Sequence, residues 1–169
     1  MDEQFLYRDL GFLILGSRLR RMSEYFLSEV NRVYQQQGFS FEAGWFPLFF
    51  ILARGEPVSL RAVADELMIS HSAVSQLVKH LKEKKLVETI PSELDKRSLL
   101  LQLTEKGTKL RDELQPVWLE ISKSLQEMEK IHPAVAHFLP ALADLESHFE
   151  KQSLSSIISA NLEETRLAK

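Results

Sequence analysis

Short polar side chains and lysines recur along one side of the segment Ser70–Glu88, SHSAVSQLVKHLKEKKLVE. Serine and glutamine can donate and accept hydrogen bonds, which suits the base edges exposed in the major groove of DNA. Lysines farther along can reach phosphates, and the free N–H groups of a helix that starts after Ser70 also favour a phosphate there. These residue types indicate contact with nucleic acid. The candidate DNA-binding residues of the segment are Ser70, His71, Ser72, Ser75, Gln76, Lys79 and Lys82.

The same segment has an apolar side, which predicts that it is a helix packed on a core. Val74, Leu77, Val78 and Leu81 fall together at helical spacing. A short helix, SLRAVADEL, precedes the segment with Ser59 as its N-cap, and the residues MIS form a tight connection. This order predicts a helix-turn-helix whose second helix reads DNA. The plain alternative is a helix face that is polar only because it is solvated, although such faces more often carry Glu–Lys pairs.

A β-hairpin is predicted directly after the helix pair. LVETI and LLLQLT have the length and composition of strands, and PSELDKRS between them is a polar turn. Lys96 and Arg97 lie at its tip, where an inserted arginine is attracted by the negative potential of a narrow minor groove. An ordinary solvated turn, with an Asp95–Arg97 ion pair worth about 0–1 kcal/mol, is the alternative. Next to a helix-turn-helix we favour a DNA-binding wing that contains Lys96 and Arg97.

The remaining segments predict long helices, so the fold class is mainly α with a small β wing. The first helix runs from Phe5 to about Gln37, with apolar residues repeating every seven positions, and ends at Gly38. That seam fits either the core of a monomer or a contact with a second subunit. Thr104 caps another long helix, a further helical stripe runs from 135 to 149, and residues 154–162 carry a weaker one.

An apolar segment, FEAGWFPLFFILARGEP, lies between the first helix and the helix pair and predicts a short helix from about Glu42 to Ala53. Pro47 is compatible with its first turn only. Trp45, Phe46, Phe49 and Phe50 fit a hydrophobic core better than a ligand-binding cluster.

Composition bounds the class of protein. The chain has 169 residues, 44% hydrophobic and 27% charged, which fits one domain or two small lobes. It has no cysteine, so disulfides, zinc–thiolate sites and thiol redox switches are excluded. We expect a cytoplasmic protein, because neither a secretion signal nor an apolar run of about 18 residues is evident. Residues 54–111 contain eleven Lys and Arg against eight Asp and Glu, whereas the remainder contains ten against sixteen. The basic middle favours an anionic partner.

The stretch SLRAVADELMISHSAVSQLVKHLKEKKLVETIPSELDKRSLLLQLTEKG resembles the winged helix-turn-helix of MarR-type transcriptional regulators. SHSAVSQLVKHLKEKKLVE matches the recognition helix and the entry into the wing, and DKRS with LLLQLTEKG matches the wing, its return strand and the start of the next helix. The flanking long helices extend the resemblance over nearly the whole chain. It implies a helical dimerisation lobe formed by residues 1–40 and 104–169, and a DNA-binding lobe formed by residues 41–103.

The resemblance also implies a function. A homodimer, usually a repressor, is expected to bind near-palindromic operators in double-stranded DNA with two recognition helices about 34 Å apart. A small aromatic or phenolic effector is expected between the two lobes, near Trp45, Phe46 and Phe49, where it lowers the affinity for DNA by changing that spacing.

Two other classes of protein remain as alternatives. Glu129 with His132, and Asp144 with His148, have spacings that can bind a metal on a helix, but isolated pairs of this kind arise by chance. Neither a phosphate-binding glycine loop nor a nucleophile elbow is present. We therefore expect no enzyme activity, no cofactor and no metal. A winged helix that binds a protein instead of DNA would tend to have an apolar or acidic recognition face, unlike the one here.

Overall fold

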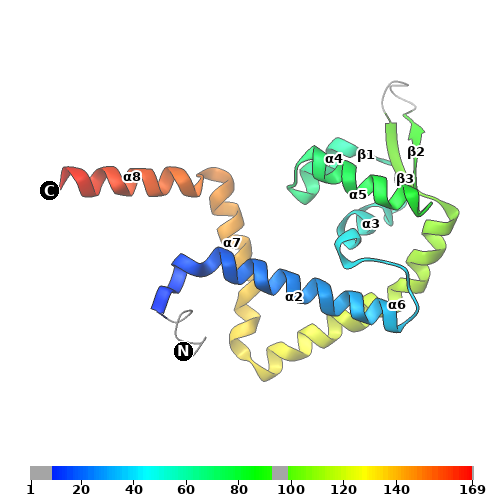
Figure 1. The fold of residues 1–169 in the computed structure, drawn as a ribbon, viewed down its shortest axis with the longest axis horizontal. Helices are drawn as coiled ribbons and strands as arrows, with labels where there is room; N and C mark the ends of the chain where they lie inside the picture. The colour runs from blue at the N-terminus through cyan, green and yellow to red at the C-terminus, as the bar shows by residue number, and fades with distance from the viewer. Residues whose placement is uncertain (1–8, 93–98, 169) are drawn as a thin grey trace. The chain divides into compact units, whose positions relative to one another are not determined.

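The computed structural model describes residues 9–92 and 99–168, so the wing residues Lys96 and Arg97 lie outside the described part of the chain (Figure 1). Helices dominate, and a small antiparallel sheet completes the fold, as the sequence predicted. The chain divides into two compact units, Met1–Pro116 and Val117–Lys169. Among the described residues, no helix combines the length and the apolar character needed to cross a membrane.

The first long helix, α2, spans Leu15–Gln36 and follows a 3-10 helix at Gly11–Ile14. The sequence predicts a helix from Phe5 with a possible kink at Gly11 or Gly16, and the regular α-helix is interrupted at Gly11, which has a positive φ of 49°. The predicted stop at Gly38 is confirmed. Gly38 has φ 78°, its N–H donates to the Gln35 carbonyl at 3.0 Å, and the next N–H, of Phe39, donates to Tyr34 at 2.8 Å.

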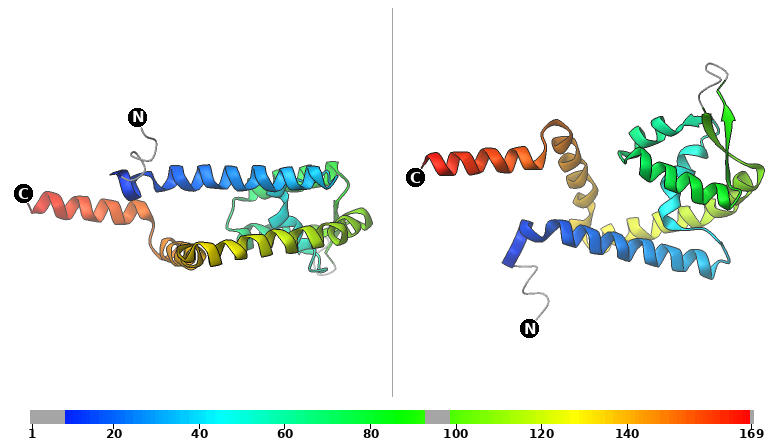
Figure 2. Two further views of the ribbon diagram at one scale, coloured as in Figure 1. Left: turned by 90° about the horizontal axis from the view of Figure 1, so that it is seen from below. Right: turned by 45° about the horizontal axis from the view of Figure 1, so that its top comes forward.

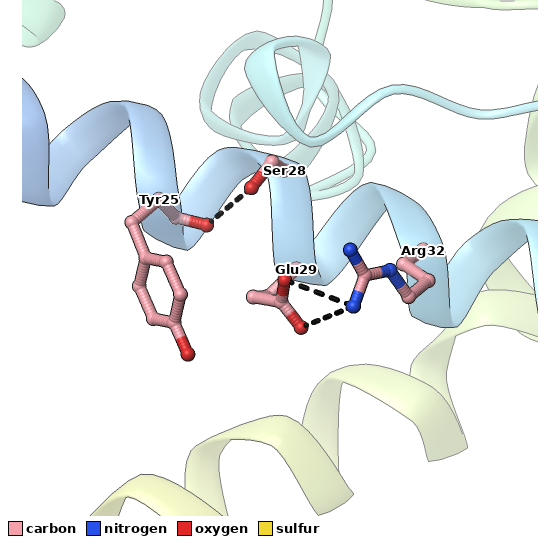
Figure 3. A network of polar contacts seen from close by, with 4 residues as sticks. All are labelled: Tyr25, Ser28, Glu29 and Arg32. Atoms are coloured by element: carbon pink, nitrogen blue, oxygen red, sulfur yellow. Dashed lines mark hydrogen bonds and ion pairs between the residues drawn. The ribbon is translucent and has the colours of Figure 1, made fainter.

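Polar contacts between residues one turn apart stabilise the exposed side of α2. Figure 3 shows the Ser28 hydroxyl donating to the carbonyl of Tyr25 at 2.8 Å, and Arg32 paired with both carboxylate oxygens of Glu29 at 3.2 Å. Such pairs three residues apart stabilise a helix by about 0.2–0.5 kcal/mol each. They do not connect α2 to another element.

The core of the first unit begins with an aromatic cluster. The ring of Phe41 packs edge-on against Tyr34, Trp45 and Phe49, with centroids 5.4, 5.6 and 5.1 Å apart. Trp45 ends the 3-10 helix η2, Ala43–Trp45, and Phe49 lies in α3, Phe46–Leu52, which replace the single helix predicted here. The core continues through apolar residues of the later elements: Leu48, Leu52, Val63, Val74, Leu81, Leu86, Leu101 and Leu114.

A three-stranded antiparallel sheet lies beside the helix pair. Its strands are β1 (Val58–Ser59), β2 (Val87–Pro91) and β3 (Leu99–Leu103), in the order β1-β3-β2. The predicted hairpin is confirmed, with Val87 opposite Leu103 and Pro91 opposite Leu99. β1 was not predicted, because two residues are too short for a periodic signal. In Figure 2 (right) the hairpin stands beside the helix pair and extends past it.

The second unit is entirely helical in its described residues. It contains the C-terminal half of α6 (Glu105–Ile131), the 3-10 helix η3 (Pro133–His137), α7 (Phe138–Lys151) and α8 (Leu154–Leu167). The weak stripe at 154–162 is thus part of a helix that continues to Leu167. Ser153 starts it, since its hydroxyl oxygen accepts from the N–H of Ser156 at 3.2 Å. None of the described side chains in this unit is buried.

Candidate nucleic-acid interface

A helix-turn-helix is formed by α4 (Leu60–Leu67) and α5 (His71–Glu83). The hydroxyl of Ser59 caps α4 by accepting from the N–H of Ala62 at 3.1 Å. Met68 ends α4 in the left-handed region, with φ 52°, and the N–H of Ile69 returns to the Ala64 carbonyl at 3.1 Å. The chain therefore reverses over three residues, which brings the start of α5 close to the end of α4.

Ser70 begins α5 as the sequence predicted. Its hydroxyl oxygen accepts from the N–H of Ala73 at 3.2 Å and lies 2.9 Å from the hydroxyl of Ser72. Asparagine, aspartate and serine are the strongest N-caps, because their side chains satisfy a backbone donor that the helix leaves free. The cap fixes where α5 starts and hence which residues face outward.

The two faces of α5 separate as the periodicity predicted. Val74, Val78 and Leu81 are buried against the core, and Leu77 is half-buried. At about 100° per residue, the six candidate residues within α5 fall on the opposite face in an arc of roughly 140°, and Ser70 precedes the helix as its cap. All seven are exposed: Ser70, His71, Ser72, Ser75, Gln76, Lys79 and Lys82. The helix thus presents a continuous polar surface of mostly short side chains.

The hydrogen bonds on this face limit what each group can offer. The Ser75 hydroxyl donates to the carbonyl of His71 at 2.8 Å, so its oxygen is left to accept from a partner. Gln76 is exposed one residue farther along, and its amide offers both a donor and an acceptor. Ser75 and Gln76 together can match the edge of a base pair that presents hydrogen-bond donors and acceptors side by side.

Lys82 connects α5 to the wing. Its ammonium group donates to the hydroxyl of Thr89 on β2 at 3.0 Å. The sequence analysis missed Thr89, since the only sign of it was a polar side chain within an otherwise apolar strand. Lys79 lies one turn earlier on the same side, so two cations lie near the base of the hairpin. Lys96 and Arg97, predicted for the tip, are outside the described residues.

The three aromatic residues predicted for effector binding differ in exposure. Trp45 and Phe49 are core residues, with exposed fractions of 5% and 0%. Phe46 is half-buried, and its ring lies 5.4 Å from that of Phe50. An open depression of about 370 Å³ adjoins Trp45 and is otherwise lined by Glu42, Gly44, Ala73, Gln76, Leu77 and His80. The structure therefore brings Trp45 and Gln76 to one depression, whereas Phe46 and Phe49 do not line it.

Metal-binding groups are not assembled in the described part of the chain. No group of three or more His, Asp or Glu side chains there is close enough to hold a metal ion. His80 is 3.8 Å from the carboxylate of Glu83, a contact between two residues of one helix. This contact joins neighbouring turns of α5 and does not bring the helix to another element.

A helix-turn-helix with a two-stranded wing at its C-terminal side defines the chain as a winged helix protein. Comparison with known proteins shows which family this segment resembles. Residues 37–98 match the model of the MarR family. The regulator MgrA of Staphylococcus aureus is 32% identical over 89 residues, which are 51% of this chain and 60% of MgrA. The match thus spans less than two thirds of that relative. Over its winged-helix segment the chain is thus similar to regulators of the MarR family.

Solved structures agree on the fold. A MarR/EmrR family regulator from Acinetobacter sp. ADP1 superposes with a TM-score of 0.65 at 24% identity, covering 82% of this chain and 95% of that one. BpsR of Bordetella bronchiseptica, whose DNA binding is regulated by 6-hydroxynicotinic acid, superposes with a TM-score of 0.62 at 23% identity, covering 78% and 91%. At these identities the likeness concerns architecture.

Proposed function

We propose that the chain is a transcription regulator that binds double-stranded DNA in the cytoplasm through α5 and the wing. The observation that carries the proposal is the face of α5, on which serines and Gln76 are exposed, with lysines toward the C-terminal end. Short polar side chains allow a helix to approach base edges closely, and Gln can pair with adenine through two hydrogen bonds. Lys79 and Lys82 would contact phosphates, as would Lys96 and Arg97 in the wing.

The proposed regulator is a homodimer on a near-palindromic operator. The second unit supports this, because large apolar side chains are exposed along α6, α7 and α8: Leu119, Leu125, Met128, Ile131, Phe138, Leu139, Leu145, Phe149, Leu154, Ile158 and Leu162. Phe12, Leu19, Met22 and Phe26 are also exposed at the N-terminal end. Monomers seldom expose contiguous apolar patches above a few hundred Å². Residues 1–40 and 104–169 would form the dimerisation lobe, and residues 41–103 the DNA-binding lobe.

Repression and effector response complete the proposal. An operator-bound dimer represses when its site overlaps that of the polymerase. A small aromatic or phenolic acid would enter near Trp45, Phe46 and Phe49; the depression beside Trp45 supports this because Gln76 lines it too. A ligand there would meet a DNA-reading side chain directly. The ligand control of BpsR is a precedent in a protein of similar fold.

Selection of bound fragments from a random DNA library tests this function. The proposal predicts enrichment of inverted repeats whose half-site centres are about 34 Å apart, one turn of DNA. Sedimentation of the complex should give two chains per duplex. If the library yields no enriched sequence, the proposal is contradicted. If the chain then binds another protein through α5, the protein-interaction alternative is favoured.

A further inference from the structure

The C-terminal end of α5 and the N-terminal end of α6 meet in a tightly bonded joint. Two residues after the end of α5, Lys85 lies in the left-handed region, at φ 59°. The N–H of Lys85 donates to the carbonyl of Lys82 at 2.8 Å, and the N–H of Leu86 donates to the carbonyl of Leu81 at 2.9 Å. This pair of bonds is the Schellman ending of a helix, and it turns the chain sharply. The carbonyls of Lys84, Lys85 and Leu86 then face away from α5 and need other donors.

Thr104, which directly precedes α6, and Lys106 in its first turn supply those donors. The Thr104 hydroxyl donates to the Lys85 carbonyl at 2.7 Å, and its oxygen accepts from the N–H of Gly107 at 3.0 Å. The N–H of Thr104 donates to the Leu86 carbonyl at 3.1 Å. The ammonium group of Lys106 donates to the Lys84 carbonyl at 2.9 Å. A single hydroxyl thus caps α6 and binds the chain that leaves α5.

Gly107 allows this approach because it lacks a side chain. It is buried, and a Cβ at this position would overlap the carbonyl oxygen of Leu86, 3.1 Å from its carbonyl carbon and 3.3 Å from Cβ of Leu103. The obstacle is backbone, which cannot rotate aside as a flexible side chain can. The φ of Gly107 lies outside the left-handed region, so the requirement for glycine here is space rather than conformation.

We infer that Thr104 and Gly107 are positioning residues that set the direction of α5 relative to α6, and thereby the operator spacing that the dimer accepts. The inference rests on the proposed function. α5 has 13 residues and is about 20 Å long at 1.5 Å per residue. A change of about 5° at the joint displaces its far end by about 1.7 Å. In a two-fold dimer the same change in both subunits adds up to about 3.5 Å, close to the rise of one base pair.

Binding to operators with different half-site spacings distinguishes a positioning role of these residues from a purely stabilising one. A residue that only stabilises the fold would, when changed, lower affinity equally for all operators. A positioning residue changes the ratio of affinities between operators whose half-sites are closer or farther apart, and leaves the affinity for an isolated half-site unchanged. Single half-sites and spacing variants of the selected operator therefore distinguish the two roles.

The test uses the full chain and duplexes derived from the selected operator, with the spacing shortened or lengthened by one base pair. Gly107→Ala should change the ratio of affinities between the spacings by about tenfold or more. Thr104→Val, which loses both hydroxyl bonds but keeps the shape, should change it in the same sense, and Thr104→Ser should restore the wild-type ratio. Lys109→Ala, an exposed change two residues along the same helix, is the control.

Each outcome decides the inference. If circular dichroism shows that Gly107→Ala does not fold, the spacing preferences of Thr104→Val and Thr104→Ser decide whether the inference holds. Folded variants with the wild-type spacing preference overturn the inference while the proposed function stands. A wild-type chain that binds no duplex overturns the proposed function, and this inference with it.

Discussion

The two compact units of the molecule differ in where they bury apolar side chains. In the first unit, Phe49, Leu81 and Leu114 are fully buried, and Leu81 belongs to the helix-turn-helix itself. In the second, none of the described side chains is buried, although α6, α7 and α8 carry many large apolar residues. Because burial of apolar surface is the main force that holds a fold together, the first unit has a hydrophobic core of its own. The proposed dimer would cover the exposed apolar side chains of the second.

The largest expected effect on stability comes from removing an aromatic side chain from the core of the first unit. Phe49→Ala removes a fully buried ring at the centre of the aromatic cluster and should destabilise the first unit by about 3–5 kcal/mol. The neighbouring Phe50, whose side chain is 48% exposed, is the control. Phe50→Ala should cost less than about 1 kcal/mol. Urea unfolding followed by tryptophan fluorescence measures both, and equal losses would show that the cluster is not the core.

A charged substitution on the apolar face of the second unit should weaken the dimer. Phe138, half exposed at the start of α7, becomes buried if two chains cover this face. Phe138→Asp should then raise the dimer dissociation constant at least about a hundredfold, because a carboxylate would lose its hydration at the interface. Sedimentation equilibrium over a range of concentrations measures it. Glu146→Ala, an exposed change on the same helix, is the control. A Phe138→Asp protein that remains as dimeric as wild type would break the comparison between the units.

A third change tests the recognition face. Gln76→Ala should reduce discrimination at one base pair of each half-site by about 2 kcal/mol, since it removes a bidentate donor–acceptor group. Lys79→Ala should instead weaken all sequences evenly and reduce the slope of affinity against salt by about one. Competition binding with single-base variants of the operator separates the two. Uniform weakening by Gln76→Ala would remove that residue from base reading.

The smallest expected effect concerns the cap of α5. Ser70→Ala should lower the free energy of unfolding by about 1 kcal/mol, because the N–H of Ala73 loses its acceptor. Ser72→Ala, which touches the same hydroxyl without capping the helix, should stay within about 0.5 kcal/mol of wild type. Thermal unfolding of the two variants measures the difference, and the cap is unimportant if they unfold alike.

Features that depend on neighbouring residues could be predicted from the sequence. Ser59, Ser70 and Gly38 act through bonds to residues a few positions away, so their types and places sufficed. The inward and outward sides of α5 followed from periodicity alone. The hairpin followed from two apolar runs around a polar turn.

Features that depend on distant residues could not be predicted. β1 forms only because Val58 and Ser59 pair with Leu101 and Leu100. The bond between Lys82 and Thr89, and the space that Gly107 leaves for Leu86, join residues that the chain brings together only after folding. The candidate DNA-binding face was therefore predictable, whereas the joint that orients it was not.

The central claim is that the polar face of α5 binds DNA through close contacts to its bases and phosphates. The most direct test is the affinity of the folded wild-type chain for its selected duplex, measured by fluorescence anisotropy across a range of salt concentrations. Release of counterions predicts that affinity falls linearly on a double logarithmic plot, by at least about a hundredfold between about 50 and 200 mM salt. A folded chain that binds no duplex at the lowest salt, or whose affinity does not change with salt, would contradict the account.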